Sequence, residues 1–285
     1  MDRAEGERRM TDIVRSEAGL GAASAPPGRR SAAVLVARFA FLVAFLALWQ
    51  GVVATGLANP AFVATPLGVA RSLVALIASG ELLPNLATTL IEILISFVAS
   101  VVFGVASAIV LDRNDLLHRA LSPFLTAFNS MPRIALGPLF ILWFGIGITS
   151  KAVLAFSLGY FIMLLSTLGG LKNVDRDLLL MSRLFGASEA RLFWHVRLPW
   201  ALPSVFAGLR LSLIYCSAGA VIGEMIAAQS GLGLLVQSFS GRFDVAGVMA
   251  IILVVALMVM VLTSLMDLCE HRLLAWSRGS TNVPG

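Results

Sequence analysis

The stretch Leu86–Leu111, LATTLIEILISFVASVVFGVASAIVL, decides the fold. It is longer than the roughly 20 apolar residues that a helix needs to cross a bilayer, and Glu92 is its single charged residue. The polar sequence Asp112-Arg113-Asn114-Asp115 ends it. Of the whole chain, 58% is hydrophobic and only 13% is charged, whereas soluble domains are about 25% charged. We therefore predict an integral membrane protein.

Further apolar runs lie on both sides of this one. We expect spanning helices at about 33–54, 121–144, 152–171, 205–227 and 245–268, and a short amphipathic helix at 68–77. The run at 121–144 is expected to be broken by Pro123, Pro132 and Pro138. A span tolerates such residues only where its backbone is covered by protein or lines a cavity. The predicted fold class is all-α integral membrane with six transmembrane helices, and the proline-containing span is the best candidate for the translocation pathway.

The polar segments give the domain organisation and the orientation. Residues 1–32 are expected to form a flexible cytoplasmic tail. Residues 33–270 are expected to form the transmembrane domain with a cytoplasmic loop at 172–203, and 271–285 a cytoplasmic tail. Sixteen of the 21 lysines and arginines fall in segments on the side of the N-terminus. Three fall on the other side: Arg71, Lys151 and Arg242. Because basic residues gather in cytoplasmic loops, both termini are predicted to be cytoplasmic.

The loop at 172–203 is punctuated like two short helices. Apolar residues recur at helical spacing as far as Phe185, and Gly186 is a natural helix stop. Ser188 can cap a second short helix. Leu198-Pro199 and Leu202-Pro203 are expected to end that helix before the next span. We interpret the pair of helices as a rigid docking surface on the cytoplasmic side.

This loop resembles the signature of the inner-membrane permeases of binding-protein-dependent ABC importers. That signature reads Glu-Ala-Ala, three residues, Gly, nine residues, Ile-x-Leu-Pro. When the two are aligned on Gly186, the match at the second end is Val196-x-Leu198-Pro199, whereas the positions of Glu-Ala-Ala hold Leu180, Met181 and Ser182. Contact with an ATPase is therefore expected to rest on apolar packing and neighbouring polar residues. The residues assigned to coupling are Arg183, Leu184, Gly186, Ala187, Ser188, Glu189, Val196, Leu198 and Pro199.

The resemblance extends over about residues 66–268 and looks closest to the nitrate, sulfonate and taurine group. The sequences at 132–147, 202–210 and 223–233 resemble that group's third span, its fifth span and the turn that follows. The resemblance implies a MetI-like, type I importer core in a bacterial inner membrane, and a small anionic solute. Leu136 stands where sulfonate and taurine members often carry tryptophan, so pyrimidine vitamin precursors and aromatic acids remain open as solutes.

The chain carries no phosphate-binding loop, which requires Gly-Lys followed by Ser or Thr. Ser150 precedes Lys151, and no Ser or Thr follows Lys172. We therefore predict a translocation subunit rather than an enzyme, with no cofactor of its own and with ATP and magnesium on partner subunits. The expected partners are two ABC ATPase subunits, a periplasmic or lipid-anchored solute-binding protein, a second copy of this chain and membrane lipid. Neither a metal site nor nucleic-acid binding is expected.

Three residues are assigned to the pathway: Pro132, Arg133 and Glu224. Arg133 could attract an anionic solute, it could pair with Glu92 or Glu224, or it could lie near a water-filled cleft. Glu224 follows Gly219-x-x-x-Gly223, a pattern that permits close helix contact, and it could gate the pathway or serve packing. Glu92 is expected to be wetted near the outer end of its span. An ion-coupled secondary transporter is the rival class, but it would need internal repeats and several intramembrane carboxylates.

Overall fold

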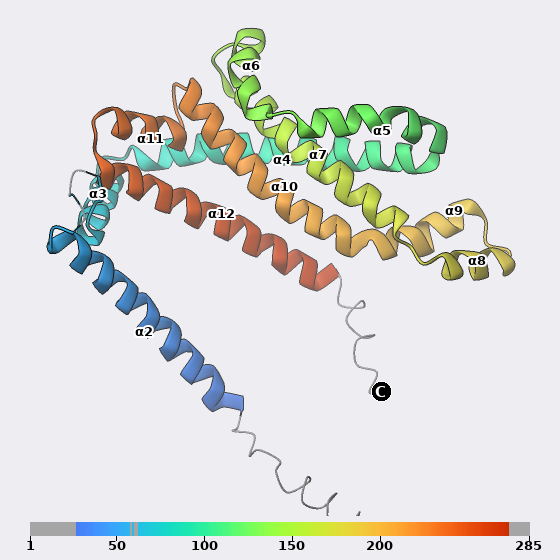
Figure 1. The fold of residues 1–285 in the computed structure, drawn as a ribbon, viewed down its shortest axis with the longest axis horizontal. Coiled ribbons are helices and arrows are strands. Elements are labelled where there is room, and N and C mark those ends of the chain that lie inside the picture. The colour runs from blue at the N-terminus through green and yellow to red at the C-terminus, as the bar shows by residue number, and fades with distance from the viewer. Residues whose placement is uncertain (1–26, 58, 60–61, 274–285) are drawn as a thin grey trace, which may run out of the picture. The chain divides into compact units, whose positions relative to one another are not determined.

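The computed structural model describes residues 27–57, 59 and 62–273, and every regular element in these ranges is a helix (Figure 1). The chain divides into two units after Asn59. The first unit holds one helix, α2 (Pro27–Ala54), whose stretch Val34–Ala54 is long and apolar enough to cross a membrane. Of the expected tails, 1–26 and 274–285 lie outside the described residues, whereas 27–32 begin α2.

The second unit contains the remaining helices. They are α3 (Pro66–Ala78), α4 (Leu82–Arg113), α5 (Asp115–Ser130), η1 (Arg133–Leu136), α6 (Gly137–Phe144), α7 (Ile148–Lys172), α8 (Arg176–Leu184), α9 (Glu189–Leu192), η2 (Phe193–Arg197), α10 (Leu198–Ile226), α11 (Leu232–Gly241) and α12 (Val245–Leu273). Each predicted apolar run is helical. Among the described residues, five helical stretches satisfy the length and hydropathy of a span, or six if the bent pair Asp115–Ser130 and Arg133–Phe144 is counted as one.

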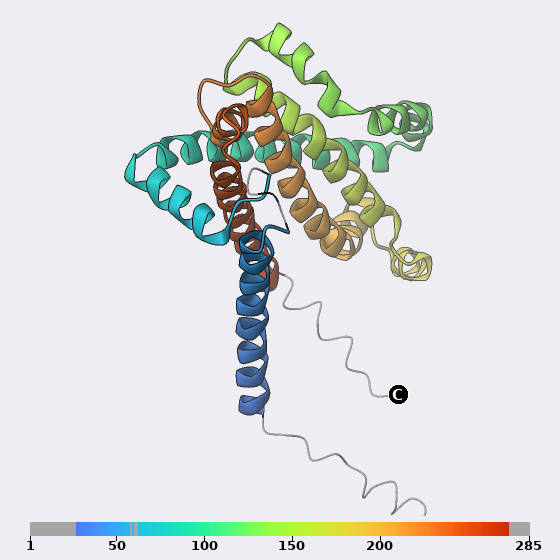
Figure 2. The ribbon, with the colours of Figure 1, turned by 60° about the vertical axis from the view of Figure 1, so that its left-hand side comes forward.

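Three helices, α4, α7 and α10, form the core of the second unit, with α7 between the other two (Figures 1 and 2). Small residues let these backbones approach. A Cβ added at Gly104 of α4 would lie 2.8 Å from the Cβ of Met163, and one added at Gly219 of α10 would lie 2.7 Å from the Cα of Ala155. Small residues at such contacts permit the close van der Waals packing that joins helices in lipid. The prediction of close contact at Gly219-x-x-x-Gly223 is thus confirmed.

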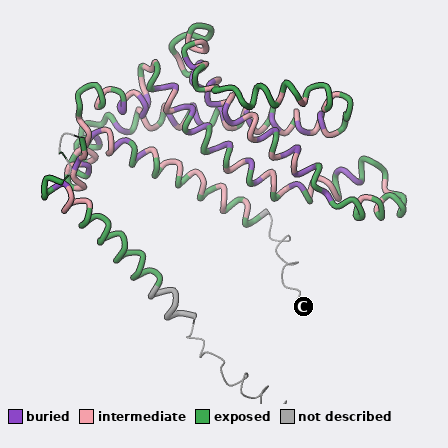
Figure 3. Tube along the Cα trace, in the orientation of Figure 1, coloured by how far each residue is buried: buried purple, intermediate pink, exposed green. Residues whose placement is uncertain are grey.

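Burial follows the same three helices (Figure 3). Apolar clusters on α4, α7 and α10 include Ile93 with Ala155 and Ala220, and Ala108 with Leu164. The outer faces of the long helices carry many exposed large apolar side chains. A soluble protein would not leave such a surface uncovered, so these faces fit contact with lipid.

Candidate functional site

The two short helices predicted after the fourth span are present, and we call residues 173–197 the coupling hairpin. Helix α8 ends as predicted at Gly186, whose φ is +79°. The Gly186 N–H donates to the Arg183 carbonyl at 2.9 Å, and the Ala187 N–H donates to the Ser182 carbonyl at 3.1 Å. This pair of bonds is the Schellman arrangement, in which a left-handed residue closes a helix. The turn between the two short helices is therefore defined by its backbone.

Helix α9 begins as predicted at Ser188, whose hydroxyl accepts from the Arg191 N–H at 3.4 Å. The expectation that Leu198-Pro199 and Leu202-Pro203 end this helix is wrong. The chain stays helical from Glu189 to Ile226. It passes through one π turn, in which the Leu198 N–H reaches back to the Phe193 carbonyl. The extra residue in a π turn changes the hydrogen-bond register. Pro199 follows this turn directly, and Pro203 lies inside α10.

The hairpin presents an apolar surface that no other described part of the chain covers. Five of its large apolar side chains are strongly exposed: Leu180 at 59%, Met181 at 60%, Leu184 at 79%, Phe185 at 90% and Trp194 at 60%. A cavity of about 360 Å³ opens beside them and is lined by Ser182, Phe185, Ala187, Arg191, His195 and Val196. On the other side, Leu192 and Phe193 are buried, and Phe193 packs with Leu171 and Ala201. The hairpin is thus anchored at one edge and open at the other.

Most of the residues assigned to coupling lie together on this hairpin. The Arg183 and Glu189 side chains form an exposed ion pair at 3.0 Å that joins α8 to α9. Leu198 and Pro199 are different, because they are half-buried in the first turn of α10. The hairpin surface therefore comprises the assigned residues from Arg183 to Val196, whereas Leu198 and Pro199 belong to the span that supports it.

The proline-containing span is broken at Pro132, as predicted, whereas Pro123 lies inside α5 and Pro138 in the first turn of α6. Helix α5 and the helical stretch Arg133–Phe144, formed by η1 and α6, are bent by 81° at residues 131–132. Pro132 lies at this break, immediately before the 3₁₀ turn η1 that carries Arg133. The lack of an N–H in proline and the steric restriction it places on Met131 both favour a helix end here.

Arg133 makes no ion pair with Glu92 or Glu224, which removes one of the alternatives left open for it. Its guanidinium donates to the Ser157 carbonyl of α7 at 2.6 Å and to the Asn129 side-chain oxygen at 3.1 Å. It also lies 4.9 Å from the centre of the Phe161 ring. No described carboxylate lies within 4.0 Å of it, since every ion pair among the described residues involves other cations. Arg133 therefore carries an uncompensated positive charge at the break.

Glu224 lies elsewhere, at the end of α10, and the structure does not bring it to Arg133. It is fully buried. Its carboxylate accepts from the Thr89 hydroxyl at 2.7 Å and from the Gly233 N–H at 2.6 Å. The Leu232 N–H donates to Thr89 at 2.8 Å. Glu224 and Thr89 thus satisfy the first free N–H groups of α11, which are the groups that a helix start leaves unpaired.

Glu92 is not wetted, so that prediction is wrong as well. It is fully buried, and its carboxylate binds the Lys151 amine at 3.1 Å. Lys151 is only 3% exposed, although its position beside an apolar run suggested an outer loop. The two charges compensate each other, whereas either charge alone in the bilayer would be costly. The sequence holds no local signal for this pair, since its members are 59 residues apart.

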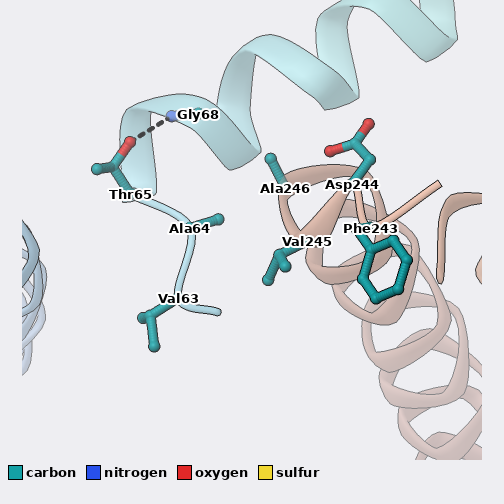
Figure 4. A pocket seen from close by; sticks show the side chains of 8 residues that line it. All are labelled: Val63, Ala64, Thr65, Gly68, Phe243, Asp244, Val245 and Ala246. Carbon is teal, nitrogen blue, oxygen red and sulfur yellow. Dashed lines mark hydrogen bonds between the residues drawn. The ribbon is translucent and has the colours of Figure 1, made fainter. Parts of the chain in front are cut away.

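A second cavity lies between the start of α3 and the start of α12 (Figure 4). Its volume is about 310 Å³, and its lining is Val63, Ala64, Thr65, Gly68, Phe243, Asp244, Val245 and Ala246. Thr65 caps α3 by accepting from the Gly68 N–H at 3.0 Å, and Asp244 caps α12 by accepting from the Gly247 N–H at 2.9 Å. Phe243 is 86% exposed and has a φ of +57°, which is uncommon for an aromatic residue. In Figure 1, α3 and the coupling hairpin lie at opposite ends of the second unit.

The chain is similar to several transport proteins. The riboflavin transport system permease protein RibX of Chloroflexus aurantiacus is 36% identical over 56% of this chain and 60% of its own length, which is less than two thirds. The formylaminopyrimidine transport permease protein ThiX of Halalkalibacterium halodurans is 30% identical over 84% of this chain and 94% of that protein. The taurine transport system permease protein TauC of Escherichia coli is 31% identical over 82% and 87%.

A solved structure shows the same fold. An inward-facing form of the MetNI methionine ABC transporter superposes with a TM-score of 0.58 and 21% identity, covering 70% of this chain and 96% of that one. The sequence family described as binding-protein-dependent transport system inner membrane component matches residues 100–275. This match decides against the ion-coupled transporter. The chain therefore belongs to the family of binding-protein-dependent transport system inner membrane components, and it is the permease subunit of an importer whose ATP is hydrolysed on separate subunits.

Proposed function

We propose that this permease moves a small anionic solute into the cytoplasm, and that its coupling hairpin is the docking surface for the ATPase subunits. The observation that carries the proposal is the exposed apolar side of the hairpin. Leu184 and Phe185 project from a turn with defined backbone geometry, and nothing else in the described chain covers them. Large exposed apolar patches mark interaction sites, and these two side chains lie outside the candidate spans.

The proposed orientation places both termini and the hairpin in the cytoplasm of a bacterial cell. The distribution of basic residues supports it, with sixteen on that side against three on the other. Of those three, Lys151 is buried against Glu92, which leaves two cations exposed in the opposite segments. The cavity between α3 and α12 then faces outward, and we place the periplasmic or lipid-anchored solute-binding protein on that face.

The proposed solute is a sulfonate, taurine or a nitrate-like anion. Arg133 supports an anion, because it offers positive charge at a break in a span with no described carboxylate nearby. The similarity to the taurine permease agrees with this choice. The similarity to the formylaminopyrimidine and riboflavin permeases favours a second candidate, a vitamin or vitamin precursor with a heteroaromatic ring.

The proposed mechanism is alternating access by a homodimer of this chain. Two ATPase subunits hold ATP and magnesium and close beneath the two coupling hairpins. The hairpins move with them and shift the core helices between inward-open and outward-open arrangements. A ligand shifts such an equilibrium only through different contacts in the two states, and a hairpin with a fixed turn transmits the movement of the ATPase as a rigid body.

The docking role is tested with the variant Phe185→Ala in the importer co-expressed with its ATPase. Phe185 is 90% exposed, so its loss should leave the free permease as stable as before. Truncating an aromatic interface residue that carries much of the binding energy costs about 2 kcal/mol, so the affinity for the ATPase should fall roughly thirtyfold. The measurement is the binding of purified ATPase to the permease in nanodiscs.

Phe243→Ala is the matched control, because Phe243 is equally exposed and lies at the other end of the unit. It should bind the ATPase like the wild type. Equal ATPase affinity of Phe185→Ala and the wild type would remove the docking role from this part of the hairpin.

A further inference from the structure

One ion pair connects the coupling hairpin to a core helix far away in the sequence. The Arg197 guanidinium binds the Asp112 carboxylate at 2.6 Å, across 85 positions of sequence. Asp112 lies in the last turn of α4, and its side chain is 1% exposed, whereas that of Arg197 is 24% exposed. The pair is therefore largely shielded from water. An ionic contact in such a place is stronger, and its loss more costly, than at an open surface.

Arg197 has a second partner on a different helix. It donates to the Leu171 carbonyl at 3.3 Å, in the last turn of α7. The hairpin begins two residues after Leu171 and ends at Arg197 itself. One guanidinium therefore joins the end of α4, the end of α7 and the start of α10, which are the three helices of the core. No other described side chain of the hairpin forms an ion pair with a core helix.

The π turn gives this arginine its direction. Arg197 is the last residue of η2, and the turn closes through the bond from the Leu198 N–H to the Phe193 carbonyl. Each added residue turns a side chain by about 100° around a helix, so an uninterrupted α-helix would aim Arg197 elsewhere. Single π turns in helices occur frequently at functional sites. Here the π turn interrupts the regular α-helical hydrogen bonding and places the Arg197 guanidinium opposite Asp112.

The pair has space and unused hydrogen-bonding capacity. A cavity of about 470 Å³ is lined by Asp112, Arg113, Glu189, Ala190, Phe193 and Arg197. The Oδ2 atom of Asp112 and the Nε atom of Arg197 are buried and have no partner among the described residues. A spare donor and a spare acceptor let the pair stay joined when the hairpin and the end of α4 move together. The Arg113 guanidinium, 4.9 Å from the centre of the Phe193 ring, adds a second contact across the same cavity.

We propose that the pair Arg197–Asp112 is the joint through which movement of the coupling hairpin reaches α4. The proposal rests on the docking role proposed above for the hairpin. Apolar contacts of Phe193 also hold the hairpin to the core, but such contacts are non-directional and permit sliding. The ion pair fixes one point of the hairpin to the end of α4, so the two move together. Arg197 and Asp112 are positioning residues, because they act through the helices and not on the solute.

The test measures whether the hairpin and α4 move as one body. Spin labels are attached at Asp177→Cys of α8 and Val110→Cys of α4, both exposed, in a Cys269→Ser background. Labelled chains are diluted with unlabelled ones, and the complex with the co-expressed ATPase is examined in nanodiscs without nucleotide and with ATP and vanadate. We expect one narrow distance for the wild type in both conditions. With Arg197→Gln, a second, longer population should appear on nucleotide binding.

Two further variants separate a joint from a merely stabilising contact. The exchange Asp112→Arg with Arg197→Asp should restore the single distance. Arg119→Gln should leave the distance unchanged, because Arg119 forms an exposed ion pair with Asp115 on the next helix. If the wild type does not bind the ATPase, the docking role fails and the joint fails with it. If the wild type binds the ATPase and Arg197→Gln keeps the single distance in both conditions, the joint alone is refuted.

Discussion

Replacing Lys151 by methionine should strongly destabilise the permease. Lys151 and Glu92 are 3% and 0% exposed and lie 3.1 Å apart. At an effective dielectric constant of about 20, opposite charges at this distance attract by about 5 kcal/mol. Removing one partner leaves the other charge buried, which typically costs about 3–5 kcal/mol. We expect Lys151→Met to lower the free energy of unfolding by this amount.

Glu224 makes the loss unequal for the two partners. The Thr89 hydroxyl donates to the Glu224 carboxylate from a position one turn before Glu92 on α4, and a Cβ added at Gly223 would lie 3.3 Å from the Lys151 Cβ. Lys151→Met leaves two buried carboxylates without a cation, whereas Glu92→Met leaves Lys151 beside the carboxylate of Glu224. Lys151→Met should therefore be the more damaging of the two single variants. The double variant should lose less than Lys151→Met alone, because apolar replacement of a whole buried pair is often nearly neutral.

The assay is reversible unfolding in detergent, followed by circular dichroism and analysed as a double-mutant cycle. Asp115→Asn is the control, because it breaks an ion pair whose side chains are 79% and 69% exposed, and it should cost less than about 1 kcal/mol. A coupling free energy below about 1 kcal/mol between Lys151 and Glu92 would refute the reasoning. So would a Lys151→Met protein as stable as the Asp115→Asn control.

Three further outcomes follow from the same structure. Gly231→Ala would place a Cβ on the Glu224 carboxylate, whereas Gly145 also has a positive φ but has open space around it. In a thermal unfolding measurement, Gly231→Ala should lower the free energy of unfolding by about 1–3 kcal/mol more than Gly145→Ala. Gly159→Ala would place a Cβ 2.7 Å from the Ser100 hydroxyl oxygen and should lower the free energy of unfolding by a similar amount. Its control on the same helix is Gly169→Ala, whose Cβ meets nothing within 4 Å and which should be neutral or slightly stabilising. Arg133→Gln should raise the apparent KM for taurine uptake about ten- to a hundredfold, because it removes a charge-assisted hydrogen bond to the solute. ATPase binding should be unchanged, and an unchanged KM would show that Arg133 does not bind the solute.

Local pattern was enough to predict the spans and the hairpin punctuation. Apolar runs had to be helical, because a backbone in lipid must satisfy its own hydrogen bonds. Gly186 and Ser188 act through their own backbone and side-chain geometry, so their roles can be read without knowing the fold. The break at Pro132 is local for the same reason. The 81° bend at that break depends on packing, which no local pattern states.

Local rules failed where a neighbouring turn or a distant residue provided compensation. Pro199 and Pro203 were expected to end a helix, but the helix continues through both: Pro199 directly follows the π turn, and Pro203 lies inside α10. The predicted environments of two charged residues were also wrong. Lys151 appeared to belong to a loop and Glu92 to a wetted end, although each is buried against the other.

The sequence by itself determined that this chain crosses a membrane through helices and carries a helical hairpin after its fourth span, because both follow from hydrophobicity and from caps within a few residues. Only the tertiary structure decided which polar and charged groups meet. Lys151 with Glu92, Thr89 with Glu224 and Arg197 with Asp112 are each joined across more than fifty positions. The free energy of a buried charge depends on its neighbours in space, and the packing of α4, α7 and α10 sets those neighbours.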